Sequence, residues 1–245
     1  IVKNHCNTLR MNFSGNYAVE FRVFDNGMAY RFVTDKKEDN IVMGEDFAIN
    51  FPANYKAHLS QPDGFRTSYE YPYTHIDTEN YAATDRMSYL PVLIETDKAY
   101  KILISEADLF DYPCMFLKGT GKNGMQSLFP KAPLAFGEDG DRSLKITKEA
   151  DYIAKTTGKR SFPWRMMVIS KEDKEIIENE MVYNLSTPCV LEDYSWIKPG
   201  QVSWEWWHDA RLYGVDFRSG YNMDSYKYYI DFASRFGIPY IIMDE

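Results

Sequence analysis

The C-terminal part of the chain follows a strand–helix–strand pattern, and this pattern restricts the fold more than any other feature. Gln201–Trp206 is predicted as a strand, and a helix is predicted at roughly Asp224–Phe236, with Asp224 as its cap and Gly237 just past its end. The apolar run Tyr240–Met243 predicts a second strand. Strands joined in this way run parallel, and parallel sheets are covered on both faces. We therefore expect these residues to begin a larger closed sheet.

Asp244 and Glu245 follow the second predicted strand directly. In α/β folds, ligands bind at the carboxyl ends of the strands. We therefore expect the sequence to stop at the rim of an active site. Neighbouring residues on a strand point to opposite faces, so at most one of these two carboxylates is expected to face a pocket.

From about residue 16 to residue 188 the sequence is dominated by short β patterns. In Val19–Val23, apolar side chains alternate with Glu20 and Arg22, which is the period of a half-buried strand. The turn Asp25–Gly27 has residues that tolerate positive φ, and it leads into Met28–Phe32 as a predicted hairpin partner. Such a pattern favours an antiparallel sandwich.

The remaining secondary-structure predictions in this region are a second hairpin, four further strands and one short helix. The hairpin joins Leu90–Thr96 to Tyr100–Ser105, and Glu172–Asn179 is the helix, followed by a possible strand at Met181–Asn184. The further strands are Phe47–Phe51, Met115–Leu117, Leu144–Thr147 and Trp164–Ile169.

Composition and charge argue against several classes of protein. The net charge is −8 and there is no cluster of five or more basic residues, which disfavours nucleic acid binding. No apolar run reaches the roughly eighteen residues of a membrane span. Cys6, Cys114 and Cys189 lie too far apart for a disulfide framework or a zinc site. Aromatic residues make up 16%, which suits sugar binding as well as an ordinary β core.

The segment Gly119–Gly124 matches the pattern G-x-G-x-x-G, but no helix follows it. A dinucleotide site needs a helix N-terminus at this point to hold the pyrophosphate, so the segment is interpreted as a flexible loop. Nucleophile elbows and H-E-x-x-H motifs are absent from the sequence.

Two groups of residues leave alternatives open. Glu106 and Asp108 follow an apolar strand and offer hard oxygen donors for calcium, although the residues alone favour a solvated loop. Trp204, Trp206 and Trp207 crowd the end of the first C-terminal strand. Alternation along this strand places Trp204 and Trp206 on one face and Glu205 and Trp207 on the other, and both core packing and a sugar platform fit.

Several segments, in order along almost the whole chain, resemble glycoside hydrolase family 97. They are Phe21–Val23, Ala29–Phe32, Ile104–Leu109, Phe162–Arg165, Trp196–Gly200, Trp204–Trp207, Tyr226–Ala233 and Tyr240–Glu245. The resemblance implies a supersandwich-like N-terminal β-sandwich in residues 1–188. It also implies that residues 189–245 begin a (β/α)₈ TIM barrel, of which only the first βαβ unit is present.

The resemblance also implies a function, a cofactor and a location. We expect a fragment of a calcium-dependent, exo-acting α-glycosidase that hydrolyses terminal α-linked sugars, located in the periplasm or secreted as in Bacteroides-type bacteria. A retaining α-galactosidase is favoured, with an inverting α-glucosidase next. By this match Glu106 is a calcium ligand, in place of the solvated-loop interpretation.

The substrate is expected to contact Met125, Gln126 and Ser127, and also Trp206, Trp207, Asp244 and Glu245. Glycosidases need two carboxyl groups that flank the scissile bond, and adjacent Asp244 and Glu245 cannot be that pair. The general acid and the nucleophile or base are expected downstream of Glu245, so the fragment alone should be inactive. The alternatives are a non-catalytic carbohydrate-binding β-sandwich module and a purely structural or interaction domain.

Overall fold

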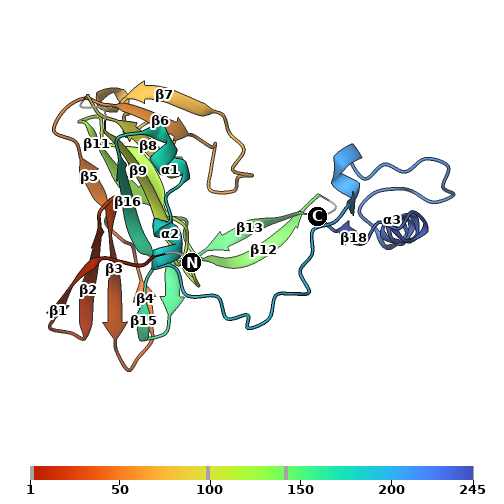
Figure 1. Cartoon of the computed structure of the whole chain (residues 1–245), viewed down its shortest axis with the longest axis horizontal. Coiled ribbons are helices and arrows are strands. Elements are labelled where there is room, and N and C mark those ends of the chain that lie inside the picture. The colour runs from red at the N-terminus through yellow and green to blue at the C-terminus, as the bar shows by residue number, and fades with distance from the viewer. Residues whose placement is uncertain (1–2, 98–99, 141–142, 245) are drawn as a thin grey trace. The chain divides into compact units, whose positions relative to one another are not determined.

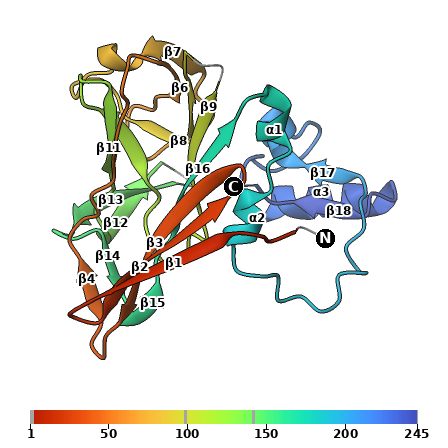
Figure 2. The ribbon, with the colours of Figure 1, turned by 60° about the vertical axis from the view of Figure 1, so that its left-hand side comes forward.

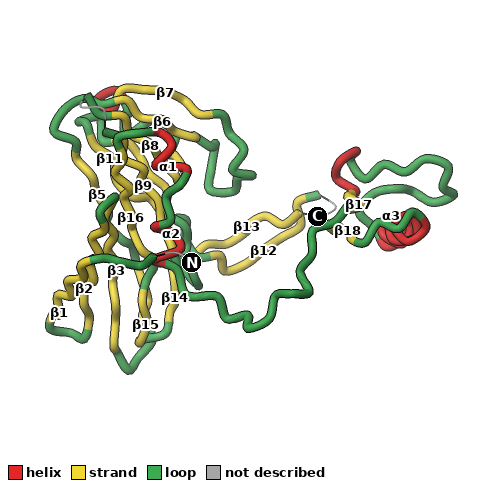
Figure 3. Tube along the Cα trace, viewed as in Figure 1, coloured by secondary structure: helices red, strands yellow, loops and turns green. Residues whose placement is uncertain are grey.

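The computed structural model describes residues 3–97, 100–140 and 143–244, and the chain divides into two compact units. The first unit comprises residues 1–134 and 148–188, and the second comprises residues 135–147 and 189–245. Strands dominate the first unit, as Figure 3 shows. No helix among the described residues is long and apolar enough to cross a membrane.

The first unit is built mainly from antiparallel strands. Its strands are β1 (Asn7–Phe13), β2 (Tyr17–Phe24), β3 (Gly27–Asp35), β4 (Asn40–Val42), β5 (Ala48–Asn50), β6 (Lys56–Ser60), β7 (Tyr73–Asp77), β8 (Ser88–Glu95), β9 (Lys101–Ala107), β10 (Phe116–Gly119), β11 (Gly124–Leu128), β14 (Ala154–Thr156), β15 (Lys159–Ser161) and β16 (Trp164–Ser170). Its short helices are η1 (Thr78–Asn80), α1 (Asp173–Ile177) and α2 (Met181–Leu185).

Most of these strands belong to one continuous sheet of twelve strands. Along its main path the order is β1-β2-β3-β16-β9-β8-β10-β11-β5, while β15 pairs with β3, and β6 pairs with both β7 and β8. Figures 1 and 2 show β2, β3 and β16 side by side, as this order requires. Strand β8 pairs with β10 through its first residues and with β9 through its last ones. It therefore joins the part of the sheet that runs from β1 to β9 to the part that runs from β10 to β5.

The main hydrophobic core draws side chains from both ends of the sheet. Leu59 of β6, Ile94 of β8 and Ile104 of β9 pack in one cluster with Leu117 of β10 and Met125 of β11. All five side chains are at most 1% exposed. Tyr30 of β3 also packs against this cluster and stacks on Phe47, which directly precedes β5 at the other end of the strand order. Strands that are far apart in the order therefore share one core, which is consistent with the predicted β-sandwich.

A second core cluster lies where α2 packs on the sheet. Met181 and Leu185 are four residues apart, so they lie on the same face of α2 and pack with Trp164, Met166 and Val168 of β16. The prediction of a strand at Met181–Asn184 was therefore wrong, because these two apolar residues follow helical spacing.

The first predicted hairpin is confirmed, because β2 pairs with β3 in antiparallel orientation, but its buried face and its turn differ from what the sequence pattern indicates. Strand β2 buries Glu20 and Phe24 while Val23 is 49% exposed, because the Glu20 carboxylate is paired with Arg22 and Arg31. None of the three described residues of the turn Asp25–Gly27 has positive φ. The glycine serves close packing instead, since a Cβ at Gly27 would lie 2.4 Å from the carbonyl oxygen of Met167.

The segment that matches G-x-G-x-x-G is the hairpin between β10 and β11, and it is ordered by backbone contacts. A Cβ at Gly119 would lie 2.0 Å from the carbonyl oxygen of Tyr81, and Gly121 has a φ of +69°. The glycines therefore serve chain packing and a turn, and no helix follows them to hold a phosphate.

The second unit contains a two-stranded hairpin and a strand–helix–strand segment. The hairpin strands are β12 (Pro133–Asp139) and β13 (Ser143–Glu149). The first two residues of β12 and the last two of β13 belong to the first unit. The segment comprises β17 (Val202–Trp204), the 3₁₀-helix η2 (Glu205–His208), α3 (Met223–Arg235) and β18 (Tyr240–Ile242). Strands β17 and β18 pair in parallel, with Val202 opposite Tyr240, as the sequence predicts.

The ends of these elements differ from the prediction in two places. The cap of α3 is Asn222 and not Asp224, because the Asn222 side chain accepts a hydrogen bond from the Ser225 amide at 3.0 Å. Strand β17 ends at Trp204, where η2 begins, so the strict alternation predicted through Trp207 was wrong. Gly237 has a φ of +66° just after α3, as expected of a residue that ends a helix.

Candidate functional site

The first unit contains a buried ion network in which one arginine binds two carboxylates. The Arg165 Nε and Nη2 atoms donate to the two Glu45 carboxylate oxygens at 2.6 and 2.7 Å, and Nη1 donates to Glu106 Oε2 at 2.5 Å. The Arg165 side chain is 1% exposed, and those of Glu45 and Glu106 are 6% and 11% exposed. A charge-assisted network of this kind holds both carboxylates in fixed positions.

The β-sheet register accounts for half of this arrangement. Arg165 of β16 lies directly opposite Glu106 of β9, so the two side chains emerge from neighbouring strands on the same face. Glu45 comes from the segment between β4 and β5. The Met115 amide donates to both Glu106 oxygens at 3.2 and 3.3 Å, and the Tyr112 hydroxyl donates to Glu45 at 3.1 Å.

Burial and charge oppose each other in setting the pKa values of this network. Burial raises the pKa of the Glu106 carboxyl, while the Arg165 charge and the Met115 amide lower it, and burial prevails. For Arg165, burial lowers the pKa, but hydrogen bonding to Glu45 and the charges of both carboxylates raise it by more. Arg165 therefore stays cationic. Its positive charge stabilises the ionised form of the buried Glu106 carboxyl, against the effect of burial.

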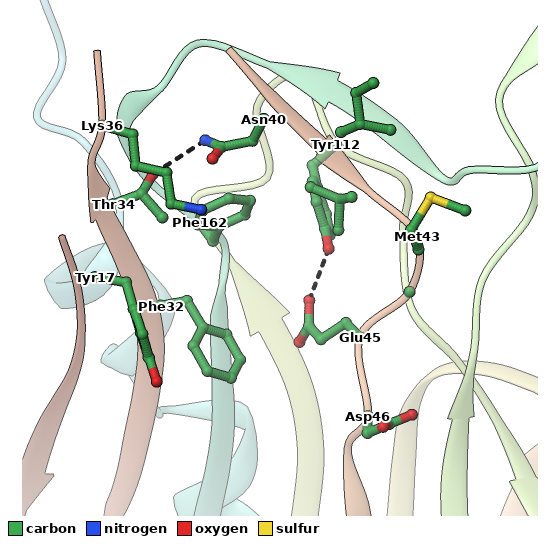
Figure 4. Close-up of a pocket in the computed structure, with 13 residues that line it drawn as sticks. Tyr17, Phe32, Thr34, Lys36, Asn40, Met43, Glu45, Asp46, Tyr112 and Phe162 are labelled. Carbon is green, nitrogen blue, oxygen red and sulfur yellow. Dashed lines mark hydrogen bonds between the residues drawn. The ribbon is translucent and has the colours of Figure 1, made fainter. Parts of the chain in front are cut away.

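A cavity of about 480 Å³ lies beside the Glu45 end of the network. Its lining includes the aromatic side chains of Tyr17, Phe32, Tyr112 and Phe162 together with the Glu45 carboxylate. Figure 4 shows the Tyr112 hydroxyl pointing at that carboxylate, to which it donates a hydrogen bond. Aromatic faces with a few fixed polar groups are a combination that suits a polyhydroxylated ligand.

The chemistry of Glu106 fits a calcium ligand only in part. Its carboxylate supplies the hard oxygen donors that calcium prefers, and Arg165 and Met115 fix its orientation. Among the described residues, however, no group of three or more His, Cys, Asp or Glu side chains is arranged to hold a metal ion. Calcium takes six to eight oxygen ligands, so Glu106 fits as one ligand of a site whose others come from elsewhere.

The three residues predicted as a substrate loop lie on strand β11. Met125 is fully buried in the main core, whereas Gln126 is exposed. Ser127 is tied to the segment that carries Glu45, since its hydroxyl donates to the Glu45 carbonyl oxygen at 2.7 Å and accepts from the Phe47 amide at 2.9 Å. The segment is thus a strand, although the family resemblance implies a loop at this place. Its contact with substrate stays a prediction.

The residues predicted in the second unit gather near the ends of β17 and β18. Trp206 and Trp207 lie in η2 and are 41% and 81% exposed. Asp244 accepts a hydrogen bond from Trp204 Nε1 at 3.0 Å. Glu245 lies outside the described residues. The substrate contacts of these residues stay predictions.

Sequence reasoning missed three charged residues that the structure buries. Glu205 is 2% exposed, and its Oε1 accepts from the Tyr226 hydroxyl at 2.9 Å and the Asp244 amide at 2.7 Å. Arg165 and Glu205 carried a usable signal, because each is a charged residue among apolar or aromatic neighbours and needs a partner when buried. Glu45 lies in a segment without any pattern and carried none.

Comparison with known families defines the class of protein. The family model described as Glycosyl-hydrolase 97 N-terminal matches residues 1–188, and the one described as Glycoside hydrolase 97 matches residues 204–245. The chain belongs to glycoside hydrolase family 97, which confirms the resemblance found in the sequence.

Two curated relatives carry similar names. The retaining alpha-galactosidase of Bacteroides thetaiotaomicron is 38% identical over 256 residues, which cover 100% of this chain and 38% of that protein. The probable retaining alpha-galactosidase of Streptomyces bingchenggensis is 27% identical over 241 residues, which cover 96% of this chain and 33% of that protein. The chain thus spans only 38% and 33% of the lengths of these two relatives.

Solved structures share the fold at lower identity. A glycoside hydrolase family 97 enzyme from Pseudoalteromonas sp. strain K8, in complex with acarbose, has a TM-score of 0.68 and 21% identity, covering 97% of this chain and 38% of that one. A beta-arabinopyranosidase has a TM-score of 0.67 and 22% identity, covering 96% of this chain and 37% of that one.

Proposed function

We propose that this chain belongs to a calcium-dependent, exo-acting α-glycosidase that hydrolyses terminal α-linked sugars, and that it is a retaining α-galactosidase. The observation that carries the proposal is the 38% identity, across the whole chain, to a protein named a retaining alpha-galactosidase. Family membership supports glycoside hydrolysis in general. The name of this relative supports galactose as the sugar and retention as the stereochemical outcome.

The second unit, in this proposal, begins a (β/α)₈ catalytic barrel. The parallel pairing of β17 with β18 around α3 supports it, because such units occur in sheets covered on both faces. Ile230 of α3 and Phe236, which directly follows α3, are 44% and 61% exposed, and Ile242 of β18 is 42% exposed. Further strands and helices of a barrel would cover these apolar side chains.

Calcium, in this proposal, is held by Glu106 together with oxygen ligands from outside the described residues. The orientation of the Glu106 carboxylate by Arg165 and Met115 supports this role. The bound ion would supply positive charge next to the substrate. The chain's own contribution is to hold one carboxylate oxygen in place and to neutralise the buried Glu45 and Glu106 charges.

The substrate, in this proposal, meets Trp206, Trp207 and Asp244 near the carboxyl ends of β17 and β18. The exposed indole faces support this placement, because aromatic rings pack on sugar rings. A contact with Met125, Gln126 and Ser127 of β11 is proposed separately, and among these three residues Gln126 has the exposed side chain. The general acid and the nucleophile are assigned to positions beyond Glu245. We also propose a periplasmic or secreted location, which rests on the family resemblance alone.

The test uses the full-length protein that contains this sequence. We expect hydrolysis of p-nitrophenyl α-galactoside in preference to the α-glucoside, with the α-anomer of galactose as the first product seen by NMR. Activity should disappear in chelator and return with calcium. Preference for the α-glucoside with the β-anomer first would favour the inverting α-glucosidase instead. Sugar binding without turnover of either substrate would favour a carbohydrate-binding module.

A further inference from the structure

Two histidines meet on the outer face of the sheet, at the edge strand β7. His58 of β6 lies directly opposite His75 of β7, and their Nδ1 atoms are 2.6 Å apart. The ring centroids are 4.7 Å apart and the rings are inclined by 71°. Ala57 and Leu59, which flank His58 along β6, point into the core, so the two imidazoles lie on the solvent side.

A carboxylate stands on the far side of His58. The Oε2 atom of Glu95, on the neighbouring strand β8, lies 3.4 Å from His58 Nε2. That nitrogen is buried and has no well-aligned hydrogen bond within the described part of the chain. A carboxylate at this distance favours the proton on Nε2, which leaves the lone pair of His58 Nδ1 directed at His75.

We propose that His58 and His75 bind a divalent transition-metal ion of the zinc, nickel or copper type through their Nδ1 atoms. Imidazole nitrogen is a preferred ligand of these ions, and a carboxylate on the opposite ring nitrogen is the usual outer partner of a metal-bound histidine. Glu95 takes that outer role here and orients the His58 ring.

The geometry requires only a small adjustment to accept the ion. Metal–nitrogen bonds of about 2.0–2.1 Å in tetrahedral geometry place the two nitrogens about 3.3 Å apart, so the rings must separate by about 0.7 Å. His75 is exposed on an edge strand and is free to rotate by this amount. In the described residues no third His, Cys, Asp or Glu completes such a cluster, so water fills the remaining positions.

This site differs in chemistry from the calcium site proposed at Glu106. Calcium binds hard oxygen donors and has little affinity for imidazole, whereas the His58–His75 pair offers two nitrogens. Binding of a transition metal at the histidines therefore does not depend on whether the protein hydrolyses α-galactosides, and the two proposals can fail separately.

The test is calorimetric titration of chelator-treated protein with NiCl₂, which avoids the strong preference of zinc for the free cysteines. We expect His75→Asn to weaken the tightest nickel binding at least about tenfold, and Glu95→Gln to weaken it to a smaller extent. The control variant His5→Asn should bind as the wild type does, and excess CaCl₂ should not compete.

Circular dichroism of each variant checks that the fold is retained, which the exposure of His75 leads us to expect. Equal nickel affinity in wild type and His75→Asn would overturn the proposal. A loss in His5→Asn equal to that in His75→Asn, or displacement of nickel by calcium, would overturn it as well.

Discussion

Replacement of Arg165 by Met should destabilise the first unit strongly, because it leaves two buried carboxylates without their cation. Glu45 and Glu106 are 6% and 11% exposed, and together they receive three short hydrogen bonds from Arg165. Removing one partner of a buried ion pair costs about 3–5 kcal/mol. A domain of this kind is stable by about 5–15 kcal/mol, so the variant should lose a large part of its stability.

The matched control is Arg86→Met, which breaks an ion pair of similar length at the surface. Arg86 Nη2 lies 2.7 Å from Asp63 Oδ1, but the two side chains are 60% and 66% exposed, so the loss should be about 0–1 kcal/mol. Urea unfolding followed by the β-sheet circular dichroism signal measures both variants. Adding Glu45→Gln to Arg165→Met should recover part of the loss, because one buried charge is removed.

The reasoning is refuted if Arg165→Met and Arg86→Met lower the free energy of unfolding by the same small amount. It is also refuted if the double variant Arg165→Met with Glu45→Gln is less stable than Arg165→Met alone. Either result would mean that the buried charges are solvated in a way the structure does not show.

Three further predictions concern packing, capping and alkaline pH. Gly119→Ala should lower the free energy of unfolding in urea by about 1–3 kcal/mol, because its Cβ would lie 2.0 Å from the Tyr81 carbonyl oxygen. Gly64→Ala should lower it far less, because a Cβ at Gly64 would have no atom within 4 Å. Asn222→Ala should destabilise α3 by about 1 kcal/mol, because it removes the side chain that caps the helix. The loss is measured as an earlier decrease of the helical circular dichroism signal on heating. Burial raises the pKa of Tyr30 from 10.0 to about 12, so stability should fall as the pH rises between these values, and less so in Tyr30→Phe.

Each of these predictions has a result that contradicts it. Equal stability of Gly119→Ala and Gly64→Ala would remove the packing explanation for the glycine-rich hairpin. A larger loss in Asp224→Ala than in Asn222→Ala would restore Asp224 as the cap. An ultraviolet titration in which Tyr30→Phe removes an ionisation step near pH 10 would show that Tyr30 is not buried in solution.

The sequence predicted the kind of elements well and the details of burial less well. The parallel strand pair and α3 follow from apolar spacing and from Gly237, and these signals are local. The buried face of β2 was not predictable in this way, because Glu20 is buried only through Arg22 and Arg31, which come from two strands. Strand β1 was missed although it carried a local signal, since Leu9, Met11 and Phe13 alternate with Arg10 and Asn12. All seven of its residues are exposed, so burial does not follow this alternation.

The candidate site was predictable only where a family pattern or a local signal exists. Glu106 entered through the family resemblance, since a carboxylate near the end of a strand has many possible roles. Glu45 is 120 residues away from Arg165 in sequence, and only the folded sheet brings them together. Such long-range ion pairs leave no mark in local periodicity, so the network became visible only in the structure.

The calcium dependence of the full-length protein carrying Glu106→Gln tests the central claim most directly. Activity on p-nitrophenyl α-galactoside is measured against calcium concentration after chelator treatment, with the exposed Glu79→Gln as control and circular dichroism to confirm folding. We expect Glu106→Gln to need at least about tenfold more calcium than either the wild type or the control. Identical calcium dependence in all three proteins, or full activity in chelator, would contradict the account.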